Sequence, residues 1–284
     1  MARHIVITPC YNDWKSLNKL LSELNKIKKK SRRILDIFIM NDYSNLKFNI
    51  KKNKYKNIKS INIINLKRNV GSQKAIFIGL QYIKKQNFSS TITIMDSDGE
   101  DDPVKVAKLI NLSQKFKKHI IVAERSKRTE KIYFKFLNYL RLILTFLITG
   151  KYLNFGNFSS FHSSILKKIL FNSNLSMAYS AGVAKNYKHF KKYPVKKKKR
   201  FFGFSKVSFN FLLEHSVNII SVFKNEVALR SFIFLIICFY LFKLKIFIII
   251  FLCIFLFNLM IFINYIRHIN LKLSLDEIKE VKKL

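Results

Sequence analysis

Five carboxylates stand within seven residues of this chain, in the stretch DSDGEDD at positions 96–102, which we call the acidic turn. They are Asp96, Asp98, Glu100, Asp101 and Asp102. The whole chain of 284 residues holds only 16 Asp and Glu against 53 Lys and Arg. Two carboxylates separated by one residue can both reach one hard cation such as Mg²⁺, which prefers oxygen ligands and substrate phosphates. A cation held there would neutralise a diphosphate as a bond breaks, so the turn predicts an anion site that works through a metal.

A second interpretation of the acidic turn stays open. Asp101 and Asp102 directly precede Pro103, and Asp is a common cap at the start of a helix. Capping would explain these two side chains without any ligand, but it leaves Asp96 and Asp98 unexplained.

The elements that must position these carboxylates alternate along the first half of the chain. We expect strands at residues 5–8, 34–40, 61–66, 91–95 and 119–123, and helices at 14–27, 71–83 and from Pro103 onward. This order predicts an α/β fold with a mostly parallel sheet and helices on both faces. Ligands bind beyond the carboxyl ends of the strands in such sheets, and Asp42 and Asp96 both fall at those ends.

Composition limits the classes of partner without choosing one. A formal net charge of +37 attracts nucleic acid, anionic lipid headgroups or phosphorylated substrates. Lys, Asn, Ile and Phe are abundant together, which also fits a simple compositional bias. The three cysteines, Cys10, Cys238 and Cys253, have no metal or disulfide spacing, which indicates a reducing compartment. We expect no signal peptide, because the N-terminus runs almost at once into a strand-like stretch.

Two apolar segments mark the C-terminal part. Residues 227–242 carry Arg230 as their only charge, and residues 246–263 carry none. They favour two membrane helices joined by a short turn, since neither has a polar face. Lys243 and Lys245 in the turn fit a full crossing poorly, so the hairpin either spans the bilayer or enters one leaflet. The basic remainder would stay on the cytoplasmic side.

Two middle segments are ambiguous. Residues 132–148 are apolar around most of a helical circumference, which fits either a core helix or a helix in a membrane interface. The run 196-KKKKR-200 fits a nucleic-acid patch, a lipid-facing patch or a solvated loop.

Five motifs in order resemble family 2 glycosyltransferases. They are 8-TPCYND-13, 41-NDYS-44, 69-NVGSQKAIFIG-79, 96-DSDGEDDP-103 and 200-RFFGFSK-206, similar to P-x-Y-N-E, D-D-x-S, N-x-G with Ala and Gly, D-x-D-x-x-D-x-P, and R-x-x-G-x-S-K. The last motif, followed by two apolar segments, resembles the polyprenyl-phosphate sugar transferases, the dolichyl-phosphate mannosyltransferase-like branch. Each motif is weak alone, whereas five in order are specific.

The resemblance implies a GT-A-type domain over residues 1–224, a transmembrane hairpin over 225–266 and a short basic cytoplasmic tail over 267–284. It implies inverting transfer from a nucleotide sugar with Mg²⁺ or Mn²⁺ held by Asp96, Asp98 and Glu100. The nucleotide-sugar contacts would be Pro9, Tyr11, Asn12, Asp13, Asn41, Asp42, Gly71, Asp96 and Ser97. The catalytic residues would be Asp98, Asp101 and Arg125, and the phosphate contacts Arg125, Arg200, Ser205 and Lys206.

Two departures from the family pattern affect substrate choice. Asn41 replaces the first Asp of the D-D-x-S turn, which puts the choice of donor in doubt more than activity. Ser159, in 156-GNFSSF-161, replaces an arginine, so one acceptor contact is missing or comes from Arg128 or Lys131.

The acceptor follows from a shortage of acid. A neutral hydroxyl acceptor needs a general base, usually a carboxylate in the middle third, but residues 131–199 contain no Asp or Glu. A phosphate monoester is already anionic at pH 7, with a second pKa of about 6. We therefore expect transfer to a polyprenyl phosphate at the cytoplasmic membrane face, in contact with lipid and without nucleic acid.

Two alternatives stay open: a membrane transferase that extends a saccharide or lipid headgroup, and a basic membrane-anchored nucleic-acid binder. The sugar, the nucleotide, the prenyl length, the preferred metal and assembly into a homo-oligomer are not specified by the sequence.

Overall fold

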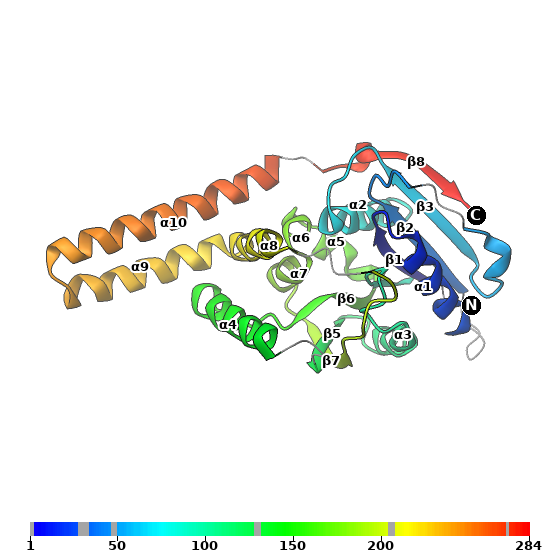
Figure 1. Cartoon of the computed structure of the whole chain (residues 1–284), viewed down its shortest axis with the longest axis horizontal. Helices are drawn as coiled ribbons and strands as arrows, with labels where there is room; N and C mark the ends of the chain where they lie inside the picture. The colour runs from blue at the N-terminus through cyan, green and yellow to red at the C-terminus, as the bar shows by residue number, and fades with distance from the viewer. Residues whose placement is uncertain (1–2, 28–33, 47–49, 128–131, 204–207, 271–272) are drawn as a thin grey trace.

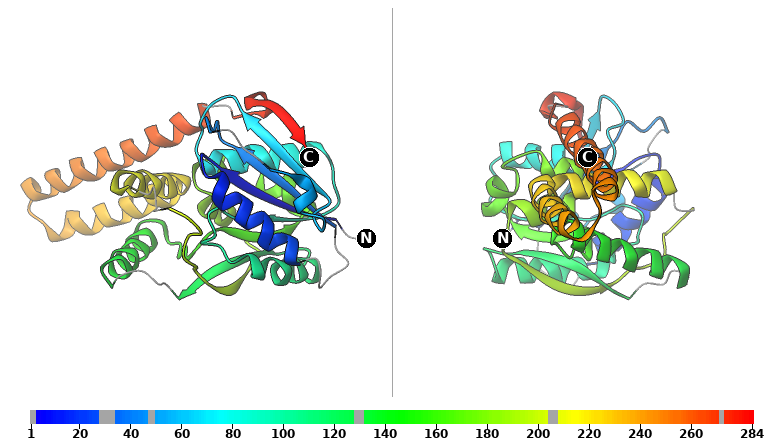
Figure 2. Two further views of the ribbon diagram at one scale, coloured as in Figure 1. Left: turned by 45° about the vertical axis from the view of Figure 1, so that its right-hand side comes forward. Right: turned by 90° about the vertical axis from the view of Figure 1, so that its left-hand side faces the viewer.

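The fold is described from a computed structural model that covers residues 3–27, 34–46, 50–127, 132–203, 208–270 and 273–284 (Figure 1). A sheet with helices on both faces forms the main body, and two long helices project from it side by side (Figures 1 and 2).

Eight strands form one mixed sheet in the order β7-β5-β6-β4-β1-β2-β3-β8. Their bounds are β1 Arg3–Cys10, β2 Ile34–Asn41, β3 Ser60–Leu66, β4 Thr91–Ile94, β5 Ile120–Lys127, β6 Phe155–His162, β7 Phe190–Lys196 and β8 Ile278–Lys283. The central strands β4, β1, β2 and β3 run parallel, whereas β6 and β8 are antiparallel to their neighbours. The expected mostly parallel sheet is confirmed at the centre of the fold.

The helices divide between the two faces of the sheet. Their bounds are α1 Trp14–Ile27, α2 Ser72–Lys85, α3 Val106–Lys115, α4 Ile132–Thr149, α5 Leu166–Ile169, α6 Asn174–Met177, α7 Tyr179–Asn186, α8 Phe209–Val222, α9 Lys224–Leu241 and α10 Leu244–Asn270. Successive residues of β1 point to opposite faces, so Ile5 and Ile7 pack in one core with α2 and α5–α8. Val6 packs in the other core with α1 and α3.

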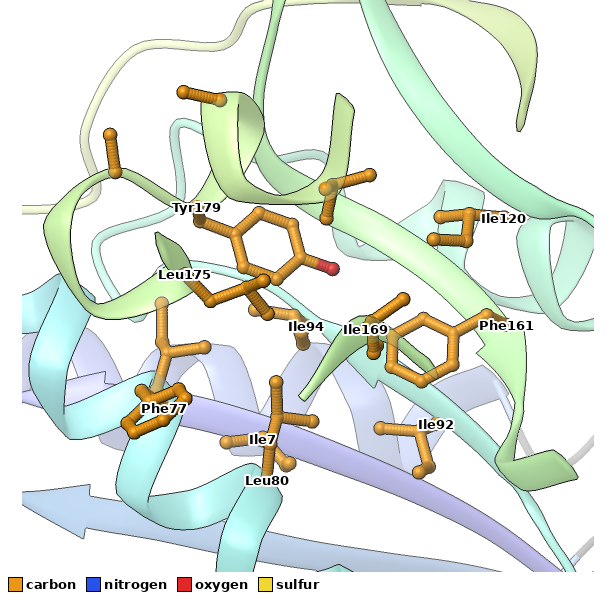
Figure 3. Packing of buried hydrophobic residues seen from close by; sticks show 14 of the residues in the cluster. Ile7, Phe77, Leu80, Ile92, Ile94, Ile120, Phe161, Ile169, Leu175 and Tyr179 are labelled. Atoms are coloured by element: carbon orange, nitrogen blue, oxygen red, sulfur yellow. The ribbon is translucent and has the colours of Figure 1, made fainter. Parts of the chain in front are cut away.

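The core on the α2 side is apolar and closely packed (Figure 3). Phe161, Ile7 and Tyr179 are fully buried there. Burying such side chains contributes roughly 1.5–3 kcal/mol each, which fixes α2, α6 and α7 against the strands. The polar side chains described below are therefore held by a rigid frame.

The projecting helices carry most of the exposed apolar surface. α10 has 27 residues, a mean hydropathy of 3.2 in its most apolar window, and only 6% of that window buried. It is the only helix in the described part of the chain that is long and apolar enough to cross a membrane, by length and composition alone. α9 has 18 residues and carries Lys224, Glu226 and Arg230 in its first two turns, so its apolar part is shorter than the helix. The expected pair of membrane helices is thus supported for α10 only.

The chain after α10 returns to the sheet, a feature that the sequence did not suggest. α10 continues to Asn270, beyond the expected boundary at residue 266, and β8 pairs antiparallel with β3. Glu277 pairs with Arg68, and Glu280 accepts a hydrogen bond from Asn65 at 3.0 Å. The segment expected as a short basic tail is therefore partly an edge strand, and both ends of the hairpin lie at the same domain (Figure 1).

Helix α4 lies along the hairpin rather than in the core. It contacts α9 and α8, and its described outer face exposes Tyr139, Leu144, Phe146 and Leu147. Of the two interpretations, an exposed apolar face beside the hairpin favours a helix in a membrane interface.

Candidate active site

The carboxyl ends of the parallel strands bring the predicted site residues to one edge of the sheet. The register pairs Cys10 of β1 with Asn41 of β2, and Ile7 of β1 with Ile94 of β4. The acidic turn follows β4 directly. Strand β6 pairs its Ser159 with Ile94, which carries the start of β6 past the same edge.

The acidic turn closes on itself through its own side chains. The Asp101 carboxylate accepts a hydrogen bond from the backbone N–H of Asp96 at 3.0 Å, and the Asp98 carboxylate accepts one from that of Glu100 at 2.9 Å. Asp102 accepts one from the N–H of Val104, as a helix cap does. The capping interpretation is therefore correct for Asp102, whereas Asp101 holds the turn itself.

Three carboxylates of the turn resist ionisation. Burial raises the pKa of Asp96, and Asn157, which donates to its Oδ1 at 3.1 Å, offsets this only in part. Burial, followed by the nearby charge of Asp96, raises the pKa of Asp98 to about 6 and that of Asp101 to about 8. Like charges crowded in a low-dielectric region favour protonation, so a cation placed here would be strongly attracted.

Residues 197–201 lie across the turn and supply cations of the chain itself. The Arg200 guanidinium contacts Asp98 at 2.9 Å and Asp13 at 3.0 Å. The backbone N–H of Phe201 donates to the Asp98 carbonyl at 2.8 Å, which fixes this segment on the turn. Arg200, expected to bind phosphate, thus pairs with two carboxylates in this structure.

Lysines of the same segment hold two more carboxylates. Lys197 pairs with Glu100 at 2.9 Å, and Lys198 pairs with Asp102 at 2.9 Å. The run 196-KKKKR-200 is therefore not simply a solvated patch, because three of its members neutralise the acidic turn.

The donor set partly fits the predicted Mg²⁺ or Mn²⁺. Asp96 and Asp98 offer carboxylate oxygens, the ligands that hard cations prefer, and their raised pKa values indicate a site short of positive charge. Glu100 is turned to Lys197 instead. Among the described residues, no group of three or more His, Cys, Asp or Glu side chains converges as a metal site. The structure therefore does not bring Glu100 in as a third ligand.

The predicted nucleoside residues form a second polar group at the ends of β1 and β2. Both carboxylate oxygens of Asp42 accept backbone N–H groups, from Val70 at 2.7 Å and Gly71 at 2.8 Å. Asn12 accepts hydrogen bonds from the N–H groups of Asn45 and Leu46. Gly71 has φ +86°, which allows the chain to turn here into α2. These contacts fix the loops that follow β1 and β2, where Tyr11 is 45% exposed.

The side-chain amide of Asn41 makes one hydrogen bond through its nitrogen and one through its oxygen. Its Nδ2 donates to Asn65 Oδ1 at 2.6 Å, and its Oδ1 accepts the N–H of Ser44 at 3.1 Å. Asn65 in turn donates to Glu280 of β8. The departure from the family's Asp is thus matched by an amide partner, and the last strand supports this end of the site.

Arg125 lies where β5 reaches the same edge. It lines a cavity together with Asp101, Gly156 and Lys197, and its charge acts on Asp96 and Asp101. A Cβ at Gly156 would come within 3.1 Å of the Arg125 guanidinium, so glycine leaves room for that group. Of the two predicted phosphate contacts that the structure describes, Arg200 is paired with carboxylates, whereas no ion pair to Arg125 is seen within the described residues.

The remaining residues named from the sequence either lie in the core or fall outside the described residues. Ser159, at the position where relatives have arginine, is fully buried and its hydroxyl lies 2.7 Å from that of Tyr179. Ser205, Lys206, Arg128 and Lys131 lie outside the described residues.

Two residues that sequence reasoning missed connect the turn to α2. Gln73 donates from its Nε2 to Asn157 Oδ1 at 3.2 Å, and Asn157 donates to Asp96. Gln73 also accepts the N–H of Tyr179 at 2.7 Å. The sequence signal was present, because Asn157 lies inside the quoted GNFSSF motif and Gln73 inside NVGSQKAIFIG, but neither motif indicates the partner.

We expect Gly99→Ala to loosen residues 197–201 from the turn. Gly99 has φ +90°, and an added Cβ would lie 2.5 Å from the Phe201 ring. Backbone strain and the clash together should lower the free energy of unfolding by about 1–3 kcal/mol, measured by urea titration. Gly203→Ala is the control, because its φ is also positive but nothing lies within 4 Å of its Cβ. An equal loss in the free energy of unfolding for both variants would contradict the close contact between Gly99 and Phe201.

His215 should make stability fall in acid. Burial, with Arg141 and Arg125 nearby, lowers its pKa from 6.5 to about 4. Between these values the unfolded chain binds the proton more readily, so folding loses stability as pH falls from about 6.5 to about 4. We expect the melting temperature of the wild type to fall more steeply than that of His215→Gln over this window. Parallel curves of melting temperature against pH for the two proteins would show that folding does not lower the pKa of the His215 imidazole.

Comparison with known proteins places the chain in a family. The sequence model of glycosyl transferase family 2 matches residues 5–188, which is more than half of the chain. The chain therefore belongs to glycosyl transferase family 2, and it is a glycosyltransferase. A search of curated proteins finds no match.

Solved structures show the fold at low identity. Glucosyl-3-phosphoglycerate synthase from Mycobacterium tuberculosis, solved with Mn²⁺, UDP-glucose and phosphoglyceric acid, is 10% identical, with 80% of each chain covered and a TM-score of 0.55. Mannosyl-3-phosphoglycerate synthase from Rubrobacter xylanophilus is 9% identical, with 80% of this chain and 74% of that chain covered and a TM-score of 0.52. S. aureus TarS 1–349 is 13% identical, with 81% and 68% covered and a TM-score of 0.48. The two synthases, with TM-scores above 0.5, show that the fold is of the GT-A type.

Proposed function

We propose that this glycosyltransferase moves a sugar from a nucleotide diphosphate sugar to a polyprenyl phosphate at the cytoplasmic face of a membrane. The observation that carries the proposal is a site edge in which buried carboxylates face Arg125, Arg200 and Lys197, while an apolar helix pair projects from the same domain. The first group suits a charged leaving group and a charged acceptor, and the second suits a lipid.

The donor half of the proposal rests on the acidic turn and on the family. Asp96 and Asp98 would hold Mg²⁺ or Mn²⁺, which would neutralise the diphosphate of the donor when bound. The Mycobacterium tuberculosis synthase of the same fold was solved with UDP-glucose and Mn²⁺. Arg200 contributes a second cation: its Nε is buried and has no hydrogen-bond partner among the described residues. A phosphate oxygen would satisfy this donor as Arg200 moves off Asp98.

The acceptor half rests on the lack of a base. Asp101, the carboxylate beside Arg125 in the cavity, has its pKa raised to about 8 by burial and the Asp96 charge. A raised pKa favours the protonated form of Asp101, and a protonated carboxyl cannot accept the proton of a hydroxyl acceptor. A phosphate monoester needs no base, because its oxygen is already anionic. Arg125 would orient that oxygen opposite the departing diphosphate, which leads to inversion at the anomeric carbon.

The path of the chain after α10 supports the proposed membrane location. Residues before α9 and after α10 both belong to the catalytic domain, so the hairpin leaves and returns on one side. The exposed apolar faces of α4 and α10 would lie in or against lipid, and the lysines would remain at the headgroups.

A panel of nucleotide sugars, assayed by thermal shift with Mg²⁺ or Mn²⁺, tests the donor. A ligand that binds only the native state must raise the melting temperature. We expect one donor to give a metal-dependent shift. If no nucleotide sugar raises the melting temperature with either metal, the proposal of a nucleotide sugar donor is wrong.

Arg125→Ala should impair use of the acceptor far more than binding of the donor. Losing a hydrogen bond to a charged group corresponds to about a 10- to 100-fold decrease in kcat/KM for the lipid phosphate. The thermal shift produced by the donor should remain. Lys192→Ala, which removes a cation already paired with Glu124 at 2.8 Å, is the matched control. An equal loss of donor and acceptor binding would contradict the assigned role.

A further inference from the structure

A second cavity lies where the catalytic domain meets the hairpin. It is lined by the first turn of α2, by α6, by α8 and by the end of α10. Its chemistry-bearing side chains are Lys74, Glu214, His215, Asn218 and His268. Figure 1 shows α8 between the body of the domain and the projecting helices. None of these side chains belongs to the acidic turn.

Lys74 brings a cation into this cavity without a close partner. Among the described residues, no hydrogen bond or ion pair reaches its ammonium group. Burial lowers the pKa of Lys74, and Arg68 and Arg267 lower it further, although Glu214 and Asp42 act in the opposite direction. The charge of Lys74 is therefore under-compensated, and an anion entering the cavity would stabilise it.

The start of α2 adds backbone donors. No side chain caps this 14-residue helix, whose N-cap is Gly71. The first N–H groups of a helix have no partner within the helix, and the helix dipole makes this end positive. Lys74 lies in this first turn, so both sources of positive potential face the same cavity.

His268 is the independent indication of a ligand. It is only 8% exposed and lines the cavity from α10. Its Nδ1 lies 3.0 Å from the carbonyl oxygen of Asn264, which can only accept, so Nδ1 carries the hydrogen. In neutral His268 the Nε2 then carries a lone pair, and no hydrogen bond reaches it among the described residues. Because the ring is largely buried but lines the cavity, its Nε2 is available to a hydrogen-bonding group that enters the cavity.

We propose that this cavity receives the phosphate of the lipid acceptor before transfer, an inference that rests on the proposed function. A phosphate monoester carries ~1.5 to 2 negative charges and three acceptor oxygens, which match Lys74 and the N–H groups of α2. Its singly protonated form also has an O–H that donates to His268 Nε2. Glu214 is a carboxylate at the exposed rim and opposes the anion, so the subsite holds the phosphate only temporarily.

The position of the cavity suits a subsite on the path of the lipid. Phe211 of α8 lines it and is 48% exposed, and α8 itself contacts α10 of the hairpin. Gln73 of α2 also lines the cavity and reaches Asp96 through Asn157. Arg125, which lines the cavity beside the acidic turn, helps to lower the pKa of His215 in this cavity, so the two cavities are near each other. A phosphate held here would therefore have a short distance to move to the transfer site.

Binding of citronellyl phosphate to the full-length protein in detergent, without donor or metal, tests the inference by calorimetry. We expect Lys74→Met to weaken binding about tenfold or more, since a charged hydrogen bond is lost. Lys74→Arg should retain binding, as should Lys168→Met, which removes an exposed lysine of α5. Citronellol should not bind measurably, and inorganic phosphate should compete weakly, which separates a lipid phosphate from free phosphate.

The outcomes separate this inference from the proposed function. If Lys74→Met binds citronellyl phosphate as tightly as the wild type, or if inorganic phosphate binds equally well, the subsite is refuted, whether or not transfer occurs. If binding depends on Lys74 but no donor sugar ever reaches a prenyl phosphate, the subsite stands and the proposed transfer falls. Unchanged donor thermal shifts in Lys74→Met show that the variant is folded.

Discussion

Asp98→Asn is expected to remove most turnover while the protein stays folded. The change deletes one of the two anionic ligands that we propose for the divalent cation, and loss of an electrostatic contact to the reacting charge costs roughly 100- to 1,000-fold in rate. Folding should not suffer, because the pKa of Asp98 is raised to about 6. A raised carboxyl pKa means that the folded state binds the proton more tightly than the unfolded state. Ionisation of Asp98 therefore lowers the free energy of unfolding as pH rises from about 4 to 6. Asparagine carries no such charge, and the melting temperature at pH 8 should not fall.

Initial rates at saturating metal and donor measure this effect, with Asp276→Asn as the control because Asp276 lies near β8, away from the acidic turn. Near-normal turnover of Asp98→Asn, with the divalent ion still required, would show that Asp98 is not a ligand.

The second large effect concerns the hairpin and requires keeping β8. A protein that simply ends at Lys224 would also lose residues 278–283, which would leave the edge of β3 unpaired and Asn65 without Glu280. Replacing residues 225–270 with a flexible linker preserves these contacts. We expect the linker variant to be released from membranes by alkaline carbonate while it still binds the donor, because α10 supplies the apolar surface that inserts.

The full-length chain should stay in the membrane pellet under the same wash. Release of the full-length chain would show that α10 does not insert, whatever the linker variant does. A shorter variant that ends at Lys224 should unfold at a lower temperature than the linker variant, which measures the contribution of β8 directly.

The parts of the fold that could be predicted are those with local signals. Apolar runs such as Ile5–Ile7 alternate with helical stripes such as Leu17, Leu20, Leu21 and Leu24, and they form the parallel centre and the cores as expected. The acidic turn at the end of β4 was predictable for the same reason, since a buried strand that stops at carboxylates places them at the sheet edge.

The parts that could not be predicted depend on pairing over long distances. β8 is a short, mostly charged segment, Ile278–Lys283, which has no strand signal of its own and forms only because β3 offers an edge. Arg200 meets Asp98 across about a hundred positions of sequence, so the family motif suggested a phosphate contact while the fold gave it carboxylate partners. Likewise, Asn157 faces Asp96 only because β6 enters antiparallel beside β4, an order that no local pattern specifies.

The most direct test of the central claim follows the sugar into its product. Purified full-length protein is incubated with radiolabelled nucleotide sugar, Mg²⁺ or Mn²⁺ and undecaprenyl phosphate, with undecaprenol and Asp98→Asn as controls. The proposed mechanism predicts label that is extracted into organic solvent and released by mild acid, as a sugar–phosphate–prenyl diester would be, and no product with undecaprenol or the variant. Label that appears only in acid-stable glycan, or equal transfer to the prenyl alcohol, would contradict it.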